Sequence, residues 1–172
     1  IKDGKLVYTV YVSSLKGTPS TIAFQDKITV SGVNLGEPNI SVIKESVPKY
    51  DQWNEGTPYN QEPVSVNDSS YSNGVLKMTL PKIEKAIIKT GSDGKSYKEY
   101  TRYKIEYIYD VTGMTVPSAK AENTVNVSSK DQTTEIEKSA NTNVTITNEY
   151  YSLDKTGSFD SNQNKIKWTI TV

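Results

Sequence analysis

Apolar and polar residues alternate along most of the chain, and this period of two is typical of β-strands that bury one face. No segment carries an apolar stripe with the period of a helix. Turn signals such as Ser72-Asn73-Gly74 and Ser92-Asp93-Gly94 separate the alternating segments. The pattern therefore predicts an all-β protein built as an antiparallel β-sandwich. The clearest predicted strands are 6–12, 22–30, 40–43, 75–80, 102–109, 124–127, 144–147 and 166–172.

Two segments depart from the alternation. Residues 48–72 are rich in Pro, Asn and Ser and contain Trp53 and Tyr59, which predicts a long surface loop. Residues 82–89 are predicted to form one short helical turn.

The amino-acid inventory removes most kinds of active site. The chain of 172 residues has no Cys and no His, which excludes disulfides, thiolate chemistry, the usual general base and the commonest metal ligand. Lys plus Arg and Asp plus Glu are both 20, so no net charge favours nucleic acid, and no apolar run is long enough to span a bilayer. We therefore expect neither an enzyme with turnover nor a cofactor, a metal site, a nucleic-acid partner or membrane insertion.

One internal similarity suggests how the chain is divided. Residues 5–12, KLVYTVYV, match residues 165–172, KIKWTITV, apolar position for apolar position. Two amphipathic strands can look alike by chance, but a tandem array of related domains explains the match better. We expect a sandwich over residues 1–130, followed by a linker and the first strands of a related domain over 131–172, or by a strand that completes or swaps into the first domain. The chain is expected to be a piece of a longer secreted protein.

Two polar residues share a face with apolar ones. Asp26 alternates in phase with Phe24 and Ile28, and Asn123 alternates in phase with Val125. Burying a carboxyl group costs several kcal/mol or forces its protonation, so two such residues in one core need an explanation. If each lies near a strand end, water satisfies them and nothing further follows. If both are buried, they can take part in a reaction with a lysine.

The reaction would be the formation of an amide bond between a lysine and Asn123. A buried lysine loses its charge and becomes a nucleophile, while a protonated Asp26 can polarise the Asn carbonyl by a hydrogen bond. The amine attacks the amide carbon and ammonia leaves. The product ties two strands together without cysteine, once per molecule and without turnover.

Three short segments carry a resemblance to a known family. The segments 22–28, IAFQDKI, 122–125, ENTV, and 155–172, beginning Lys155-Thr156-Gly157, resemble the collagen-adhesin type of immunoglobulin-like domain of Gram-positive adhesins and pilins. The resemblance implies an immunoglobulin-like sandwich with an isopeptide bond, in which Lys155, Asp26 and Asn123 match the reactive lysine, the helper acid and the acceptor amide.

The order of the lysine differs from that family, where it precedes the Asp and the Asn. Lys155 can belong to a following domain, or it can fold back or swap into a neighbour. Alternatively, Lys2 or Lys5 can replace it locally, although Lys5 lacks the inward parity. Lys2 shares the inward parity of Leu6 and Tyr8. Lys155 is the first choice because of its motif, and Lys2 is the second because of its position.

The function implied is that of a stalk or adhesin domain in a secreted, cell-wall-anchored surface protein, with neighbouring domains of the same protein as partners. The alternative is a domain that binds a host-matrix ligand, collagen-like or glycan, through Trp53 and Tyr59. Tyr103, Ile105, Tyr107 and Tyr109 form an alternating stripe that is expected to lie in the core.

Overall fold

The computed structural model describes residues 5–14, 21–31, 35–66, 68–111, 118–131, 134–147, 154–160 and 165–171. These residues form strands and no helix. The strands are β1 (Lys5–Ser13), β2 (Ile22–Val30), β3 (Asn39–Lys49), β4 (Tyr59–Pro63), β5 (Ser70–Ser72), β6 (Val75–Leu80), β7 (Ile87–Thr90), β8 (Ser96–Asp110), β9 (Ser118–Asp131), β10 (Thr134–Thr147), β11 (Asp154–Asp160) and β12 (Lys165–Thr171).

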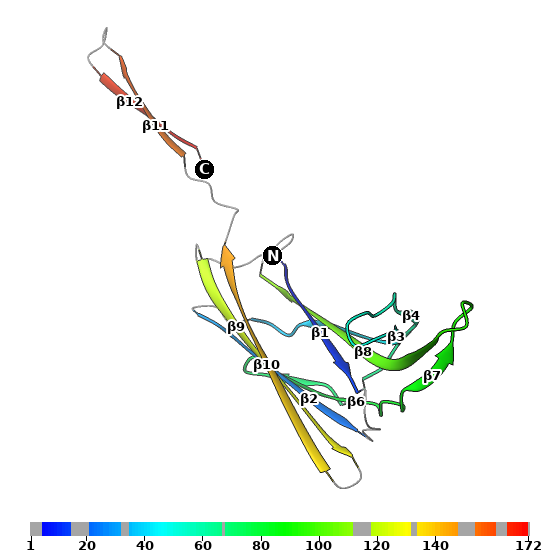
Figure 1. Cartoon of the computed structure of the whole chain (residues 1–172). Helices are drawn as coiled ribbons and strands as arrows, with labels where there is room; N and C mark the ends of the chain where they lie inside the picture. Colours follow the sequence, from blue (N-terminus) through cyan, green and yellow to red (C-terminus); the bar gives the residue numbers. More distant parts are fainter. Residues whose placement is uncertain are drawn as a thin grey trace.

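Two antiparallel five-stranded sheets make up the sandwich (Figure 1). One sheet has the order β1-β8-β3-β4, with β7 also paired to β8, and we call it sheet A. The other has the order β10-β9-β2-β6-β5, and we call it sheet B. The prediction of an all-β, immunoglobulin-like antiparallel sandwich is confirmed, and each of the eight predicted strands overlaps an observed one.

The core lies between sheets A and B and follows the alternation of the sequence. Along β2 the buried residues are Ile22, Phe24, Asp26, Ile28 and Val30. The tyrosine stripe of β8 is buried as predicted, because alternate side chains of a strand point to the same face. Within the described residues there is no helix long and apolar enough to cross a membrane.

The helical turn predicted for residues 82–89 is wrong. Residues 81–86 have no regular structure, and β7 then pairs with β8 in the register Ile87↔Glu99 to Thr90↔Ser96. Pairing in a sheet outweighs the local preference of such a short segment for a helix. Ile83 is buried against the core, which holds the irregular stretch in place.

The long loop predicted for residues 48–72 is also wrong in part. Strand β3 continues through Lys49 because it stays paired with β8 as far as Lys49↔Lys98. Strand β4 then returns along β3, and β5 pairs with β6. The irregular part is therefore confined to the turns between these strands.

The predicted boundary at residue 130 falls inside β9. Strand β10 pairs with β9 along its whole length, from Thr134↔Asp131 to Thr147↔Ser118, so it belongs to sheet B. Strands β11 and β12 form a two-stranded sheet of their own and contact only each other among the described strands. The assignment of residues 131–172 to a second domain stays a prediction.

The turn between β5 and β6 depends on a glycine. Asn73 and Gly74 both have positive φ, 50° and 75°, as a two-residue hairpin turn requires. A Cβ on Gly74 would lie 2.4 Å from the backbone oxygen of Ile28, whose amide donates a hydrogen bond to the Gly74 oxygen at 2.8 Å.

We expect Gly74→Ala to lower the free energy of unfolding by about 2–4 kcal/mol, because strain at positive φ and a backbone collision add together. Gly94→Ala is the matched control. Gly94 has nearly the same φ, 76°, but open space around it. It should lose only about 1 kcal/mol. Urea denaturation measures the free energy of unfolding of both variants. Equal losses of stability in Gly74→Ala and Gly94→Ala would contradict the role of the backbone collision at Gly74.

Candidate functional site

Asp26 and Asn123 contact each other inside the core. Asp26 lies on β2 and is 0 % exposed, and Asn123 lies on the neighbouring strand β9 and is 2 % exposed. The register pairs Ile28 with Asn123, which places the two polar side chains diagonally on the inner face of sheet B. Asn123 Nδ2 donates a hydrogen bond to Asp26 Oδ2 at 3.0 Å. The sequence pattern therefore leads to a real carboxyl–amide pair away from water, but the hydrogen bond runs from the amide nitrogen to the carboxyl oxygen and not, as expected, from the carboxyl group to the amide carbonyl.

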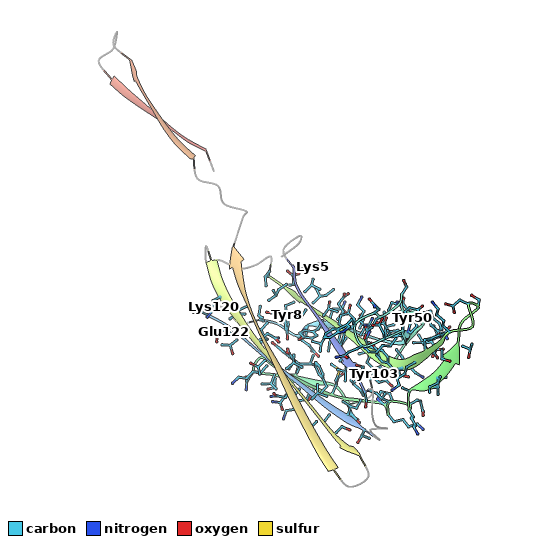
Figure 2. All side chains as sticks on the ribbon, in the orientation of Figure 1. Lys5, Tyr8, Tyr50, Tyr103, Lys120 and Glu122 are labelled. Carbon is cyan, nitrogen blue, oxygen red and sulfur yellow. The ribbon has the colours of Figure 1, made fainter. Side chains whose placement is uncertain are left out.

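Tyrosines of sheet A face this pair from across the core. Tyr8 of β1 and Tyr107 of β8 are paired in register, and their rings stack with centroids 5.5 Å apart. The Tyr107 hydroxyl accepts a weak hydrogen bond from Asn123 Nδ2 at 3.5 Å. Tyr109 meets Tyr107 edge to face at 6.1 Å. Tyr8, which Figure 2 labels on β1, is buried.

Several polar atoms of this cluster are unsatisfied. Asp26 Oδ1 and the hydroxyls of Tyr8 and Tyr109 are buried and have no hydrogen-bond partner among the described residues. Buried polar groups without partners are uncommon because each one loses its bonds to water. The cluster can therefore accept a further polar group.

Burial sets the protonation of the cluster. It raises the pKa of Asp26 from 3.8 to about 6, although hydrogen bonds from Tyr107 and Asn123 oppose the shift. Burial, followed by the charge of Asp26, raises the pKa of Tyr8 to about 12 and the pKa of Tyr107 further. Asp26 thus takes up a proton far more readily than an exposed Asp, and both phenols stay neutral.

Among the residues whose side chains the structure describes, which end at Ser129, the buried polar or charged ones are Asp26, Glu45 and Asn123, so no lysine of that part of the chain is buried beside the pair. Lys2, the candidate chosen by position, lies outside the described residues. Lys155, the candidate chosen by motif, lies on β11 opposite Ile170 of β12, and β11 contacts no described strand of the sandwich. The structure brings Asp26 and Asn123 together, and the choice between Lys2 and Lys155 as the reactive lysine stays a prediction.

The two aromatic ligand-binding candidates lie apart from this site. Trp53 is 83 % exposed, so it does not plug the end of the sandwich. Tyr59 is half-buried at the start of β4, and Lys89 Nζ lies 3.4 Å from its hydroxyl. Binding of a matrix protein through these residues stays a prediction. Among the described residues, no group of three or more Asp and Glu side chains could hold a metal ion.

A second buried carboxylate, Glu45, was not foreseen from the sequence. It lies on β3 opposite Arg102 of β8, and Arg102 Nη2 donates a hydrogen bond to Glu45 Oε2 at 3.2 Å. Arg102 also forms an ion pair with Glu55 at 3.7 Å, and the Tyr100 hydroxyl donates to Glu55 Oε1 at 2.6 Å. This cluster fastens the turn after β3 to sheet A, which is a structural task.

The tyrosines around Asp26 were predicted as core but not as neighbours of the carboxyl group. Strand parity gives the face of each residue, and both Tyr8 and Tyr107 have the inward parity. It does not say which residues of the opposite sheet lie above Asp26. The sequence pattern thus indicated that Tyr8 and Tyr107 are buried, but it did not indicate that they lie beside Asp26.

The raised pKa of Asp26 predicts a dependence of stability on pH. Between about pH 4 and pH 6 the folded protein keeps a proton that the unfolded chain has lost, so the free energy of unfolding falls as pH rises through this window. We expect a fall of up to about 3 kcal/mol that is absent in Asp26→Asn. Urea denaturation of the parent and of Asp26→Asn at pH 4 and pH 8 measures how the free energy of unfolding of each changes with pH. Comparing these two changes removes any difference in stability between the proteins that does not depend on pH.

Asp51→Asn is the control for this measurement. The side chain of Asn54 and the amides of Trp53 and Asn54 lower the pKa of Asp51 by hydrogen bonds, so its contribution is lost as pH falls. That loss falls below about pH 4, so Asp51→Asn should leave the slope between pH 4 and pH 8 almost unchanged, whereas Asp26→Asn removes the fall. The same slope in parent and Asp26→Asn would contradict a proton held by Asp26.

No protein-family model matches the chain, and no curated protein matches its sequence. Three chains of solved structures match the fold, including the following two. The collagen-binding subdomain of the surface protein ACE of Enterococcus faecalis is 11 % identical with a TM-score of 0.46, over 86 % of this chain and 90 % of that one. A structure of manganese lipoxygenase of Gaeumannomyces graminis with part of zonadhesin of Komagataella pastoris is 9 % identical with a TM-score of 0.41, over 81 % of this chain and 48 % of that one. At these values neither similarity decides what the chain does.

Proposed function

We propose that the chain is a stalk domain of a Gram-positive, cell-wall-anchored surface protein, and that an amide bond between a lysine and Asn123 fastens its sandwich. The observation that carries the proposal is the buried contact of Asp26 with Asn123, 3.0 Å apart and shielded from water. In a protein without cysteine, such a bond replaces the disulfide as a covalent tie.

The geometry suits the departure of ammonia. Asn123 Nδ2 is the nitrogen that must leave, and Asp26 Oδ2 is its hydrogen-bond partner. A protonated Asp26 can deliver its proton to that nitrogen as the carbon–nitrogen bond breaks, and it recovers a proton from the attacking amine. The lysine amine and the side-chain amide thus become one new amide and one ammonia, with no other reactant.

The surroundings favour this reaction over hydrolysis. The core around the pair is apolar, which holds an incoming lysine in its neutral, nucleophilic form and keeps water from the amide. The neutral phenols of Tyr8 and Tyr107 add no charge that would attract a lysine in its ammonium form. The unpartnered Asp26 Oδ1 can accept a hydrogen bond from the arriving amine.

The tie would serve a mechanical purpose. Joining two distant points of the chain removes denatured-state entropy, worth about 3–5 kcal/mol in the case of a disulfide. The larger effect is kinetic, since force cannot extend the segment between the joined residues. A slender extracellular domain under tension gains from both.

The intact mass of the purified chain tests the proposal. We expect a deficit of one ammonia, lost in Asn123→Ala and in Asp26→Ala because the first lacks the acceptor and the second lacks the acid. Asn126→Ala is the matched control. Asn126 lies on the same strand, but the alternation turns it to the outer face, and its removal should leave the deficit in place.

Lysine variants then identify the amine. Loss of the deficit in Lys2→Ala alone would assign the bond to Lys2. A covalent dimer that disappears in Lys155→Ala would assign it to a lysine swapped from a neighbouring chain. The full mass of a single chain in a sample with well-dispersed amide resonances would contradict the cross-link.

A further inference from the structure

An open groove of about 820 Å³ lies at a distance from the Asp26 cluster, between two turns at the edge of sheet A. One turn follows β3 and the other joins β7 to β8. The rings of Tyr50, Tyr59 and Tyr97 line it, together with Ser96 and the charged pair Asp93 and Lys95. Figure 2 labels Tyr50 on this part of the sandwich.

The first turn is fixed before any ligand arrives. The Tyr50 amide donates to the Asn54 oxygen at 3.0 Å, and the Gly56 amide donates to the Pro48 oxygen at 2.8 Å. Asp51 Oδ1 accepts from the amides of Trp53 and Asn54. A binding wall that is already ordered loses little entropy when a ligand binds.

The second turn is fixed in the same way. The Gly91 amide donates to the Lys95 oxygen at 2.8 Å, and the Lys95 amide donates to Asp93 Oδ1 at 3.0 Å. Gly94 supplies the positive φ of 76° that the turn requires. Both walls of the groove are therefore preformed.

The aromatic rings are held in place and yet face water. Tyr50 is 58 % exposed, and its ring lies 5.6 Å from that of Tyr97. A Cβ on Gly56 would lie 2.9 Å from two atoms of Tyr50, so the glycine makes room for the phenol. Tyr50 and Tyr97 also line a second hollow of about 370 Å³ with Ile88, and both sides of the pair are thus accessible.

The chemistry of the lining selects the kind of ligand. Its only charged members, Asp93 and Lys95, have opposite signs and lie 4.0 Å apart, so the groove does not attract a polyanion or a polycation. Phenols and serine and threonine hydroxyls offer donors and acceptors beside the flat rings. A purely apolar ligand would leave these groups without partners when it displaced their water.

We propose that this groove binds a neutral oligosaccharide. A sugar ring presents an apolar C–H face that stacks on a phenol and a rim of hydroxyls that hydrogen-bond to Ser96, Asp93 and the tyrosine hydroxyls. Binding at this site goes beyond the stalk role and does not depend on the cross-link, because it uses other residues.

Titration of the full chain with neutral linear oligosaccharides of glucose, galactose, mannose and N-acetylglucosamine tests the proposal. We expect at least one of these probes to shift the amide resonances of the two turns at millimolar concentration or below. Tyr50→Ala and Tyr97→Ala should each weaken its binding about tenfold or more, since each removes one stacking surface.

Two further variants keep the test specific. Tyr97→Phe retains the ring, so its affinity for the oligosaccharide should fall only a fewfold because the hydroxyl is missing. Ile87→Ala removes an exposed apolar side chain outside the lining of both hollows and should leave binding unchanged. Amide spectra show whether each variant is folded.

Three results would overturn the proposal. None of the probes shifts the turn resonances, or Tyr50→Ala and Tyr97→Ala bind as tightly as the parent, or a neutral proline-rich peptide binds more tightly than every sugar. The intact mass reports on the cross-link independently, so failure of one proposal is distinguishable from failure of the other.

Discussion

The burial of one carboxyl group shapes the interior of this protein. Asp26 occupies a position on β2 that strand alternation assigns to an apolar side chain, and its neighbours compensate for that. Asn123 supplies a hydrogen bond from the adjacent strand, and the opposite sheet presents the phenol rings of Tyr8, Tyr107 and Tyr109. Replacing buried charged groups by apolar ones of similar volume is often neutral or stabilising, so the proposed cross-link would account for the presence of a carboxyl group at this position.

The two sites proposed above share a physical requirement, which is that their side chains are held in fixed positions. In the core, neighbouring strands hold Asp26 and Asn123. At the edge of sheet A, hydrogen-bonded turns hold Tyr50 and Asp93, and the Arg102–Glu55 ion pair fastens the first turn to β8. A covalent reaction between protein groups and the recognition of a weakly binding ligand both gain from such preorganisation.

Sequence patterns predicted the features that depend on one strand at a time. The alternation in β2 and β9 identified the faces of Asp26 and Asn123, because burial in a sandwich follows a period of two. The sequence pattern did not predict features that combine several segments of the chain. Tyr50, Tyr59 and Tyr97 come from different parts of the chain, and β7 exists only because Ile87–Thr90 meets the start of β8. Glu45 was missed because it is out of phase with the buried Val42 on its own strand and its partner Arg102 comes from β8.

The central position of β2 in sheet B limits the direction from which an amine can reach Asp26. Strand β6 pairs with one edge of β2 and β9 with the other, and the Asn73–Gly74 turn extends the first of these ladders to Ile28. A strand bonded along both margins cannot swing outward without opening the middle of its sheet. The acid and its amide neighbour are therefore stationary, and any amine that meets them must travel inward between the two layers.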